Sequence, residues 1–96
     1  MNHIKVIEAS RNILTERGEK YGEMRKNFAR IGLIASEILG KPVSGYDIAI
    51  IMHALKLSRI NASPGEMDHY IDGINYLAFA AEMVEGKDAG QAPEEF

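Results

Sequence analysis

The sequence predicts an all-α protein, folded as one compact bundle of about four helices over residues 1–85. Apolar residues recur at intervals of three and four in four successive segments, which is the spacing of one helix face. The three prolines fall between or after these segments and do not interrupt them. A chain of 96 residues makes one small domain with a thin core, so we expect it to complete that core as a homo-oligomer.

The first two helices are predicted over residues 2–17 and 23–39. Gly18 ends the first, and the segment 18–22 is predicted as a loop because two of its five residues are glycines around a charged pair. Gly40 ends the second. The stripe expected on the first helix consists of Ile4, Ile7, Arg11 and Leu14. The buried side expected on the second consists of Met24, Phe28, Ile31, Ala35 and Ile38.

Helix-start signals define the third and fourth helices. Ser44 and Asp47 have the spacing of a capping box, which begins a helix over residues 45–60. The apolar arc of this helix is wider than a surface helix needs, so we expect it to be central. Ser63 is the predicted N-cap of the fourth helix, residues 64–85. The buried side expected on that helix consists of Tyr70, Ile71, Ile74, Leu77, Ala78, Ala81 and Val84.

Composition limits the partners and the chemistry. The chain has 11 Lys and Arg against 14 Asp and Glu, a net charge of −3 at pH 7, so neither nucleic acid nor a membrane is an expected partner. The absence of cysteine excludes disulfides, thiolate metal sites and a cysteine nucleophile, and favours the cytoplasm. The N-terminus has no continuous apolar segment typical of a signal peptide or membrane span. Residues 86–96 lack an apolar period and predict a mobile tail.

A cationic strip is the first candidate binding element. His53, Lys56 and Arg59 follow one another at intervals of three on the predicted central helix. Arg offers a planar fork of donors and Lys a point charge, so the strip is suited to phosphate oxygens. The alternative is that Lys56 and Arg59 extend past apolar neighbours and pair with acidic residues across the bundle.

Two carboxylates on the fourth helix are the second candidate. Asp68 and Asp72 lie four residues apart on one face, where two oxygen ligands could share Mg²⁺ if a bound substrate completed the coordination shell. In the alternative, Asp68 is favoured by the dipole at the helix N-terminus, and Asp72 pairs with Lys56 or Arg59.

The predicted loop 18–22 and the helix after it supply the third candidate. Tyr21 could stack on a base, and Arg30 could contact an anion. Asn27 projects toward the apolar side of its helix, where a polar amide needs partners. The alternative is a plain connection between helices, with Asn27 holding the backbone of that loop.

A set of residues spread along the chain carries a resemblance to a known family. They are Arg17-Gly18-Glu19-Lys20-Tyr21-Gly22, Asn27-Phe28-Ala29-Arg30-Ile31, Asp47-Ile48-Ala49, Lys56-Leu57-Ser58-Arg59, Asp68, Asp72-Gly73 and Tyr76. Over residues 6–82 the chain resembles short phage and prophage proteins of uncharacterised function. That family is distantly similar to the MazG-like all-α nucleotide pyrophosphohydrolases, which bind Mg²⁺ through acidic pairs on two helices and cleave nucleoside triphosphates.

Two departures from the MazG-like pattern bear on activity. Where the enzymes have a glutamate-rich first motif, the helix over 23–39 offers only Glu23 and Glu37, far apart. At the second motif, Asn75 stands where a carboxylate is wanted. Loss of negative charge weakens metal-dependent hydrolysis more than it weakens nucleotide binding.

The sequence therefore predicts a protein that binds a phosphorylated nucleotide-type small molecule. In the phage setting that the resemblance implies, this is a sponge that sequesters a nucleotide immune messenger in the host bacterial cytosol. The alternatives are a MazG-like Mg²⁺-dependent pyrophosphohydrolase and a non-catalytic helical interaction protein. No catalytic residue is assigned, and Mg²⁺ is expected only in the hydrolytic case, at Asp68 and Asp72. The predicted ligand contacts are Tyr21, Asn27, Arg30, His53, Lys56, Arg59, Asp68 and Asp72.

Overall fold

The computed structural model describes residues 1–16 and 18–85, without the side chains of 18–22 and 85. Within this part of the chain the secondary structure is entirely helical, which confirms the predicted all-α class. The helices are α1 (His3–Glu16), α2 (Gly18–Leu39), α3 (Gly45–Ala62) and α4 (Met67–Glu85). None of them is long and apolar enough to cross a membrane. The tail predicted over 86–96 lies outside the described residues.

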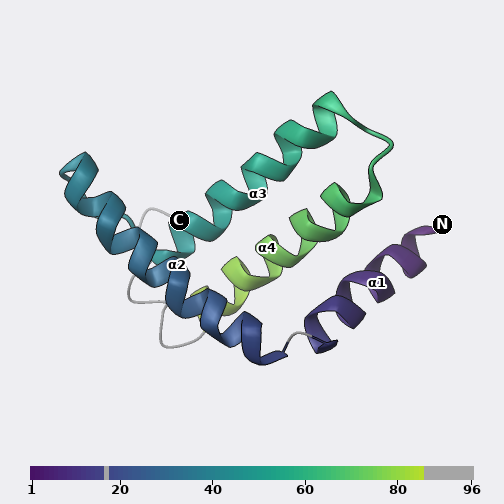
Figure 1. The fold of residues 1–96 in the computed structure, drawn as a ribbon, viewed down its shortest axis with the longest axis horizontal. Coiled ribbons are helices and arrows are strands. Elements are labelled where there is room, and N and C mark those ends of the chain that lie inside the picture. Colours follow the sequence, from purple (N-terminus) through teal and green to yellow (C-terminus); the bar gives the residue numbers. More distant parts are fainter. Residues whose placement is uncertain (17, 86–96) are drawn as a thin grey trace.

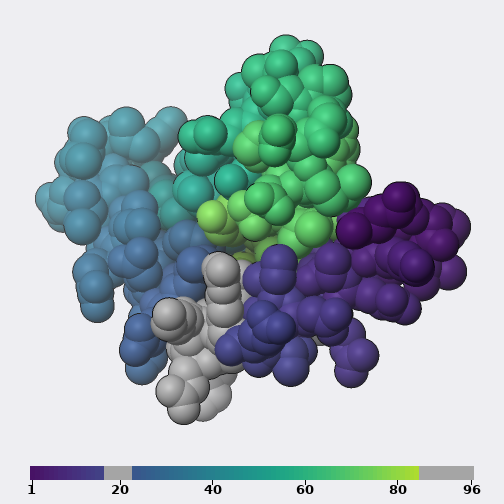
Figure 2. Space-filling model, turned by 45° about the vertical axis from the view of Figure 1, so that its right-hand side comes forward, coloured from purple at the N-terminus to yellow at the C-terminus, as the bar shows by residue number. Residues whose placement is uncertain are grey.

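The helices form a hairpin with two flanking elements (Figure 1). α3 and α4 run antiparallel, α1 lies along the other side of α4, and α2 crosses the end of the hairpin where α3 begins. Figure 2 shows the C-terminal half of α2, the α3–α4 hairpin and α1 projecting as three arms. The hairpin is therefore the centre of the fold, in agreement with the central position predicted for α3.

Two helix boundaries differ from the prediction by more than two residues. α2 already begins at Gly18, so the loop predicted over 18–22 is wrong. A glycine costs a helix only about 1 kcal/mol relative to alanine, and here helix continuity outweighs that cost. Ser63 caps the C-terminus of α3 through its backbone N–H to the Arg59 carbonyl, and Pro64 and Gly65 form a turn before α4. The predicted N-cap is thus wrong as well.

The crossing of α2 and α3 depends on two glycines at backbone contact. A Cβ on Gly32 would lie 2.8 Å from the Val43 carbonyl oxygen and 2.9 Å from the Ser44 carbonyl carbon. A Cβ on Gly45 would lie 3.1 Å from the Ala29 nitrogen. The backbones of α2 and α3 therefore approach each other more closely than they could if either position carried a side chain.

Hydrogen bonds fix the turn that leads into this crossing. The Val43 N–H donates to Ser36 Oγ at 2.8 Å, and that hydroxyl donates to the Gly32 carbonyl at 2.8 Å. The predicted capping box is confirmed: the Asp47 N–H donates to Ser44 Oγ at 3.0 Å, and the Ser44 N–H donates to Asp47 Oδ2 at 2.9 Å. The start of α3 is therefore rigidly held under α2.

The buried core lies where α2 meets the hairpin. The Phe28 ring of α2 lies 6.5 Å from Phe79 and 6.0 Å from Tyr76, both on α4. The edge-on contact with Phe79 is a favourable aromatic geometry. The residues buried in this cluster are Phe28, Ile48, Ala49, Phe79, Ala80 and Met83.

Much of the predicted apolar surface is not covered within one chain. Of the side predicted to be buried on α4, only Ile71 is fully buried, and the helix instead turns Phe79 and Met83 inward. The stripe predicted on α1 is also largely open, because Ile4 and Ile7 are more than half exposed. Large apolar residues are exposed on every helix: Ile4, Ile7, Ile31, Leu33, Ile34, Ile38, Leu39, Ile51, Leu55, Leu57, Leu77 and Val84.

The glycine crossing makes a prediction for stability. Gly32→Ala should lower the free energy of unfolding by about 1–3 kcal/mol, because its methyl group meets backbone atoms that cannot rotate away. Gly73→Ala is the matched control in α4, since its Cβ would make an ordinary 3.5 Å contact with Lys56 Cβ. That control should be neutral or stabilise by up to about 1 kcal/mol. Urea unfolding measures both, and equal effects would contradict the crossing.

Candidate functional site

The predicted ligand contacts fall into two groups on different helices. Asn27 and Arg30 lie on α2, whereas the cationic strip and the two carboxylates lie on α3 and α4. Tyr21 belongs to the first turns of α2, and its side chain lies outside the described residues. The structure therefore does not bring all the predicted contacts into one site.

Where α3 packs against α4, two members of the cationic strip are already paired. His53 Nδ1 lies 2.7 Å from the Gly73 carbonyl oxygen, so this nitrogen carries the proton and donates it. Lys56 Nζ lies 3.1 Å from Asp72 Oδ2, and the lysine side chain is only 16% exposed. This is the ion pair across the bundle that the alternative interpretation of Lys56 predicts.

The remaining members of this group stand apart from that pair. Arg59 and Asp68 are exposed, and neither side chain makes a hydrogen bond or ion pair with a described residue. Asp68 lies in the first turn of α4, where the helix dipole favours a carboxylate.

The carboxylates do not fit the Mg²⁺ site that the MazG-like resemblance implies. The Asp72 carboxylate faces the Lys56 ammonium, so its charge is already compensated by a cation that would repel Mg²⁺. The second-motif position Asn75 is only 3% exposed, and neither atom of its amide has a hydrogen-bond partner among the described residues. Within the described ranges, no group of three or more His, Asp or Glu side chains is arranged to hold a metal ion.

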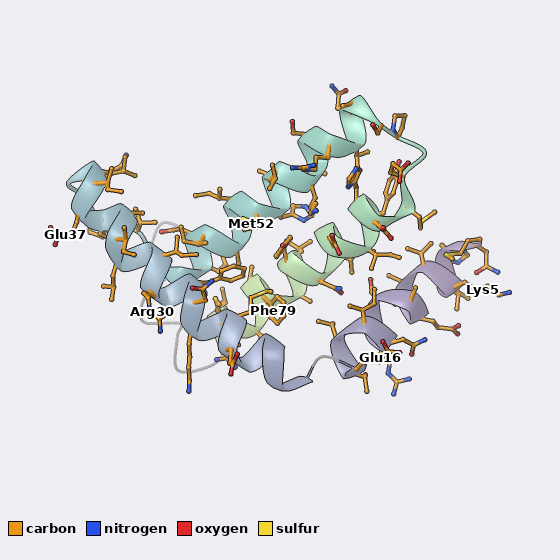
Figure 3. The ribbon with its side chains drawn as sticks, viewed as in Figure 1. Lys5, Glu16, Arg30, Glu37, Met52 and Phe79 are labelled. Atoms are coloured by element: carbon orange, nitrogen blue, oxygen red, sulfur yellow. The ribbon has the colours of Figure 1, made fainter. Side chains whose placement is uncertain are left out.

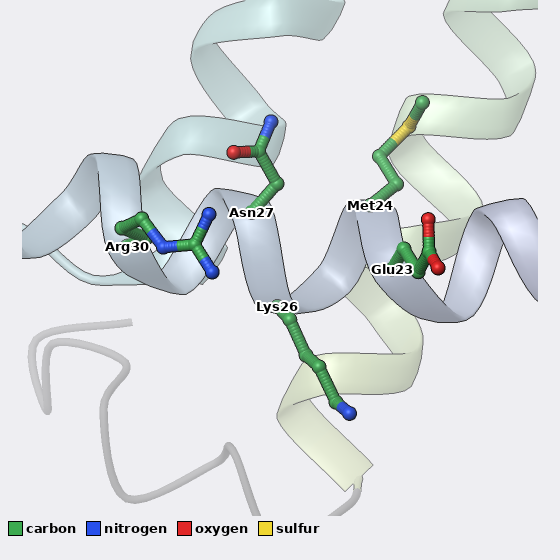
Figure 4. A pocket seen from close by; sticks show the side chains of 5 residues that line it. All are labelled: Glu23, Met24, Lys26, Asn27 and Arg30. Carbon is green, nitrogen blue, oxygen red and sulfur yellow. The ribbon is translucent and has the colours of Figure 1, made fainter.

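A concave site lies along the N-terminal half of α2. Figure 4 shows this α2 hollow, with a volume of about 570 Å³, which is lined by Glu23, Met24, Lys26, Asn27 and Arg30. The Arg30 guanidinium turns back along α2 toward the turn that carries Lys26 and Asn27. The structure thus brings together two predicted contacts, Asn27 and Arg30, and adds three that sequence reasoning missed.

The electrostatics of the α2 hollow favour an anion. Lys26 and Arg30 are exposed, lie one helical turn apart, and have no ion-pair partner among the described residues. Like charges at this spacing destabilise a helix by about 0.2–0.5 kcal/mol, a cost that a bound anion would remove. The spacing of Lys26 from Arg30 was the sequence signal that could have identified the lysine.

The neighbouring arginine has a different role. Arg25 Nη1 lies 2.7 Å from Glu82 Oε1, and this ion pair joins α2 to α4. Because the two side chains are 34% and 55% exposed, the pair contributes at most about 1 kcal/mol. Of the three basic residues in this part of α2, one therefore holds the fold and two face the hollow.

Asn27 does not have the environment that the sequence predicts. Its side chain is exposed at the hollow, and its amide makes no hydrogen bond with a described residue. Its amide is therefore available to a ligand, since it can both donate and accept.

Comparisons with known proteins agree with the predicted likeness to phage proteins. The DUF6378 family, described as a domain of unknown function, matches residues 5–84. Gene 55 protein of Mycobacterium phage D29 is 32% identical over 84 residues, which make up 88% of this chain and 56% of that protein. The chain thus spans about half the length of this curated relative. No solved structure matches. The further similarity to MazG-like enzymes stays a prediction.

The Lys56–Asp72 ion pair can be tested by a double-mutant cycle with Lys56→Gln and Asp72→Asn. We expect a coupling energy of about 0.5–1 kcal/mol in urea unfolding, because the lysine is mostly buried and the aspartate is partly exposed. The coupling should shrink at high salt. The same cycle on Arg59→Gln and Asp68→Asn is the control and should give no coupling energy. Equal coupling in both cycles would argue against a specific pair.

Proposed function

The chain belongs to the DUF6378 family, and on that premise we propose that it binds a phosphorylated nucleotide-type small molecule in the α2 hollow. The observation that carries the proposal is the pair of exposed cations, Lys26 and Arg30, one helical turn apart in a hollow that Asn27 also lines. The volume of about 570 Å³ lies within the range of about 300–1,000 Å³ common for small-molecule sites.

Each side chain of the hollow has chemistry suited to one part of such a ligand. Arg30 can donate two parallel hydrogen bonds to a phosphate, and Lys26 adds a point charge. The Asn27 amide and the Glu23 carboxylate can contact ribose hydroxyls or the edge of a base. Met24 supplies an adaptable apolar surface for the flat face of the base. Tyr21, the stacking residue expected from the sequence, precedes Met24 by one turn of α2.

We propose sequestration rather than hydrolysis as the consequence of binding. A sponge needs only fixed donors, which the α2 hollow supplies, whereas hydrolysis of this kind needs a metal-activated water. The Asp72 carboxylate, the best candidate for holding Mg²⁺, is paired with Lys56 instead. The phage relative supports a role in an infected bacterium, where nucleotide immune messengers would be the ligands.

A non-catalytic interaction protein is the second candidate function. The observation that favours it is the amount of apolar surface exposed on all four described helices. Apolar patches of this kind commonly mark protein interfaces. The two candidates are compatible, because the predicted homo-oligomer would cover apolar surface without closing the hollow.

Calorimetric titration with ADP-ribose and a cyclic dinucleotide as probes tests the proposed site. Lys26→Ala and Arg30→Ala should each weaken binding by about 1.5–3 kcal/mol, or about 10- to 150-fold, the scale of a hydrogen bond to a charged group. Arg30→Lys should recover only part of the loss, because lysine lacks the planar fork. Arg25→Ala is the matched control and should leave affinity unchanged, since that side chain pairs with Glu82.

The same titration separates the competing proposals. Loss of affinity in Lys56→Ala and Arg59→Ala, with Lys26→Ala unaffected, would show that the ligand binds between α3 and α4 instead. Recovery of intact probe after denaturation, with binding insensitive to EDTA, is the expected result for a sponge. Pyrophosphate or monophosphate released over many turnovers with Mg²⁺ would instead support the pyrophosphohydrolase. No binding of either probe would favour the interaction protein.

A further inference from the structure

A second apolar face runs along α2, apart from the face that packs into the core. Its apolar members are Ile31, Ile34 and Ile38. Together with Asn27, one helical turn earlier, they form what we call the α2 seam. The three isoleucines become more exposed toward the C-terminus of α2, with exposed fractions of 37% at Ile31, 54% at Ile34 and 76% at Ile38. The core face is formed by other residues, including Phe28 and Gly32, which are buried.

The spacing of the α2 seam is that of a helix that pairs with another helix. Its members follow one another at intervals of four, three and four, the pattern of the a and d positions of a coiled coil. A single polar residue in such a pattern, here Asn27, is a common device for specifying register. The seam is therefore patterned for a helix, and not merely apolar.

We propose that a second copy of this chain covers the α2 seam, with the two α2 helices antiparallel about a two-fold axis. In a two-fold dimer the same surface is used by both subunits, so the surface must be complementary to itself. This proposal does not rest on the proposed ligand site, because it concerns the ligand-free protein.

Charge complementarity supports a second copy as the occupant. Arg30 and Glu37 lie on the same flank of the α2 seam, seven residues apart, and Figure 3 shows both on the outer side of α2, away from α3 and α4. In an antiparallel pair, Ile31 can lie against the partner's Ile34. Arg30 then lies opposite the partner's Glu37, and Glu37 opposite the partner's Arg30. One surface thus supplies both halves of two ion pairs.

The same charges disfavour the competing arrangements. Sliding the antiparallel helices by one heptad places either the two Arg30 side chains or the two Glu37 side chains opposite each other. A parallel pair would place Arg30 beside the partner's Ala35, and both charges would stay unpaired. The sequence of α2 therefore selects one register of one orientation.

The proposed dimer would also shape the ligand site. In the favoured register the partner's Ile38 lies opposite Asn27, so the end of the partner helix borders the α2 hollow. Arg30 is shared between the hollow and the seam. Its guanidinium has five donors, enough to contact a carboxylate on one edge and a phosphate on another. The partner would thus add a wall to the hollow without consuming its cations.

Light scattering on ligand-free protein at micromolar concentration tests the dimer. The chain mass is 10.6 kDa, so the wild type should give twice that, about 21 kDa. Ile34→Asp should give the monomer mass, because it buries two charges near the two-fold axis. Leu33→Asp is the matched control: Leu33 is 70% exposed and lies outside the α2 seam, beyond Arg30 and Glu37, so this variant should stay dimeric. Circular dichroism checks that both variants remain helical.

A charge-reversal cycle tests the register. Arg30→Glu and Glu37→Arg should each raise the dimer dissociation constant by about tenfold or more, because like charges then face each other. The double variant restores opposite charges and should return most of the affinity. A monomeric wild type, a dimeric Ile34→Asp or a double variant no tighter than the single ones would each overturn the proposal. None of these outcomes depends on whether a nucleotide binds.

Discussion

The backbone contact between α2 and the start of α3 sets the positions of the other elements. Because Gly32 and Gly45 have no Cβ, the two helices cross at a distance that other residues would prevent. Ser36 and the Ser44 capping box then hold the intervening turn. The crossing places the Phe28 ring against the Tyr76 and Phe79 rings of α4. Beyond the crossing, the C-terminal half of α2 extends away from the α3–α4 hairpin. Both the α2 hollow and the α2 seam lie on the part of the α2 surface that this crossing leaves uncovered.

Local signals in the sequence predicted the helices, and long-range packing decided which faces they bury. The capping box at Ser44 and the stop at Gly40, whose φ of 70° suits glycine, involve neighbouring residues and were predictable. On α4, however, Leu77 and Val84, seven residues apart, fit one helix face as well as Phe79 and Met83, four residues apart, do. Only contacts with α2 and α3 determine that the second pair is buried. Likewise, glycines 18 and 22 suggested a bend, while Gly32, where glycine is needed, lies unmarked inside a helix.

The candidate site could be predicted only in part for the same reason. Arg25, Lys26 and Arg30 are equivalent basic residues in the sequence, and what distinguishes them is Glu82, 57 residues away in the chain. That carboxylate pairs with Arg25 and leaves the other two for the hollow. On α3, the sequence left Lys56 as either a phosphate ligand or the ion-pair partner of an acidic residue, and the position of Asp72 supports the second role. Charge alone identifies candidates, but the position of the opposite charge decides their roles.

The hollow and the seam share α2, which links the two proposals thermodynamically. Asn27 and Arg30 line the hollow and also border the seam, so a ligand held there contacts the region where the partner helix would end. Any ligand that binds the dimer more tightly than the monomer must strengthen the dimer by the same factor. If the ligand instead competes with the partner's Glu37 for Arg30, it must weaken the dimer equally. The guanidinium of Arg30 is therefore the group through which sequestration and assembly would influence each other.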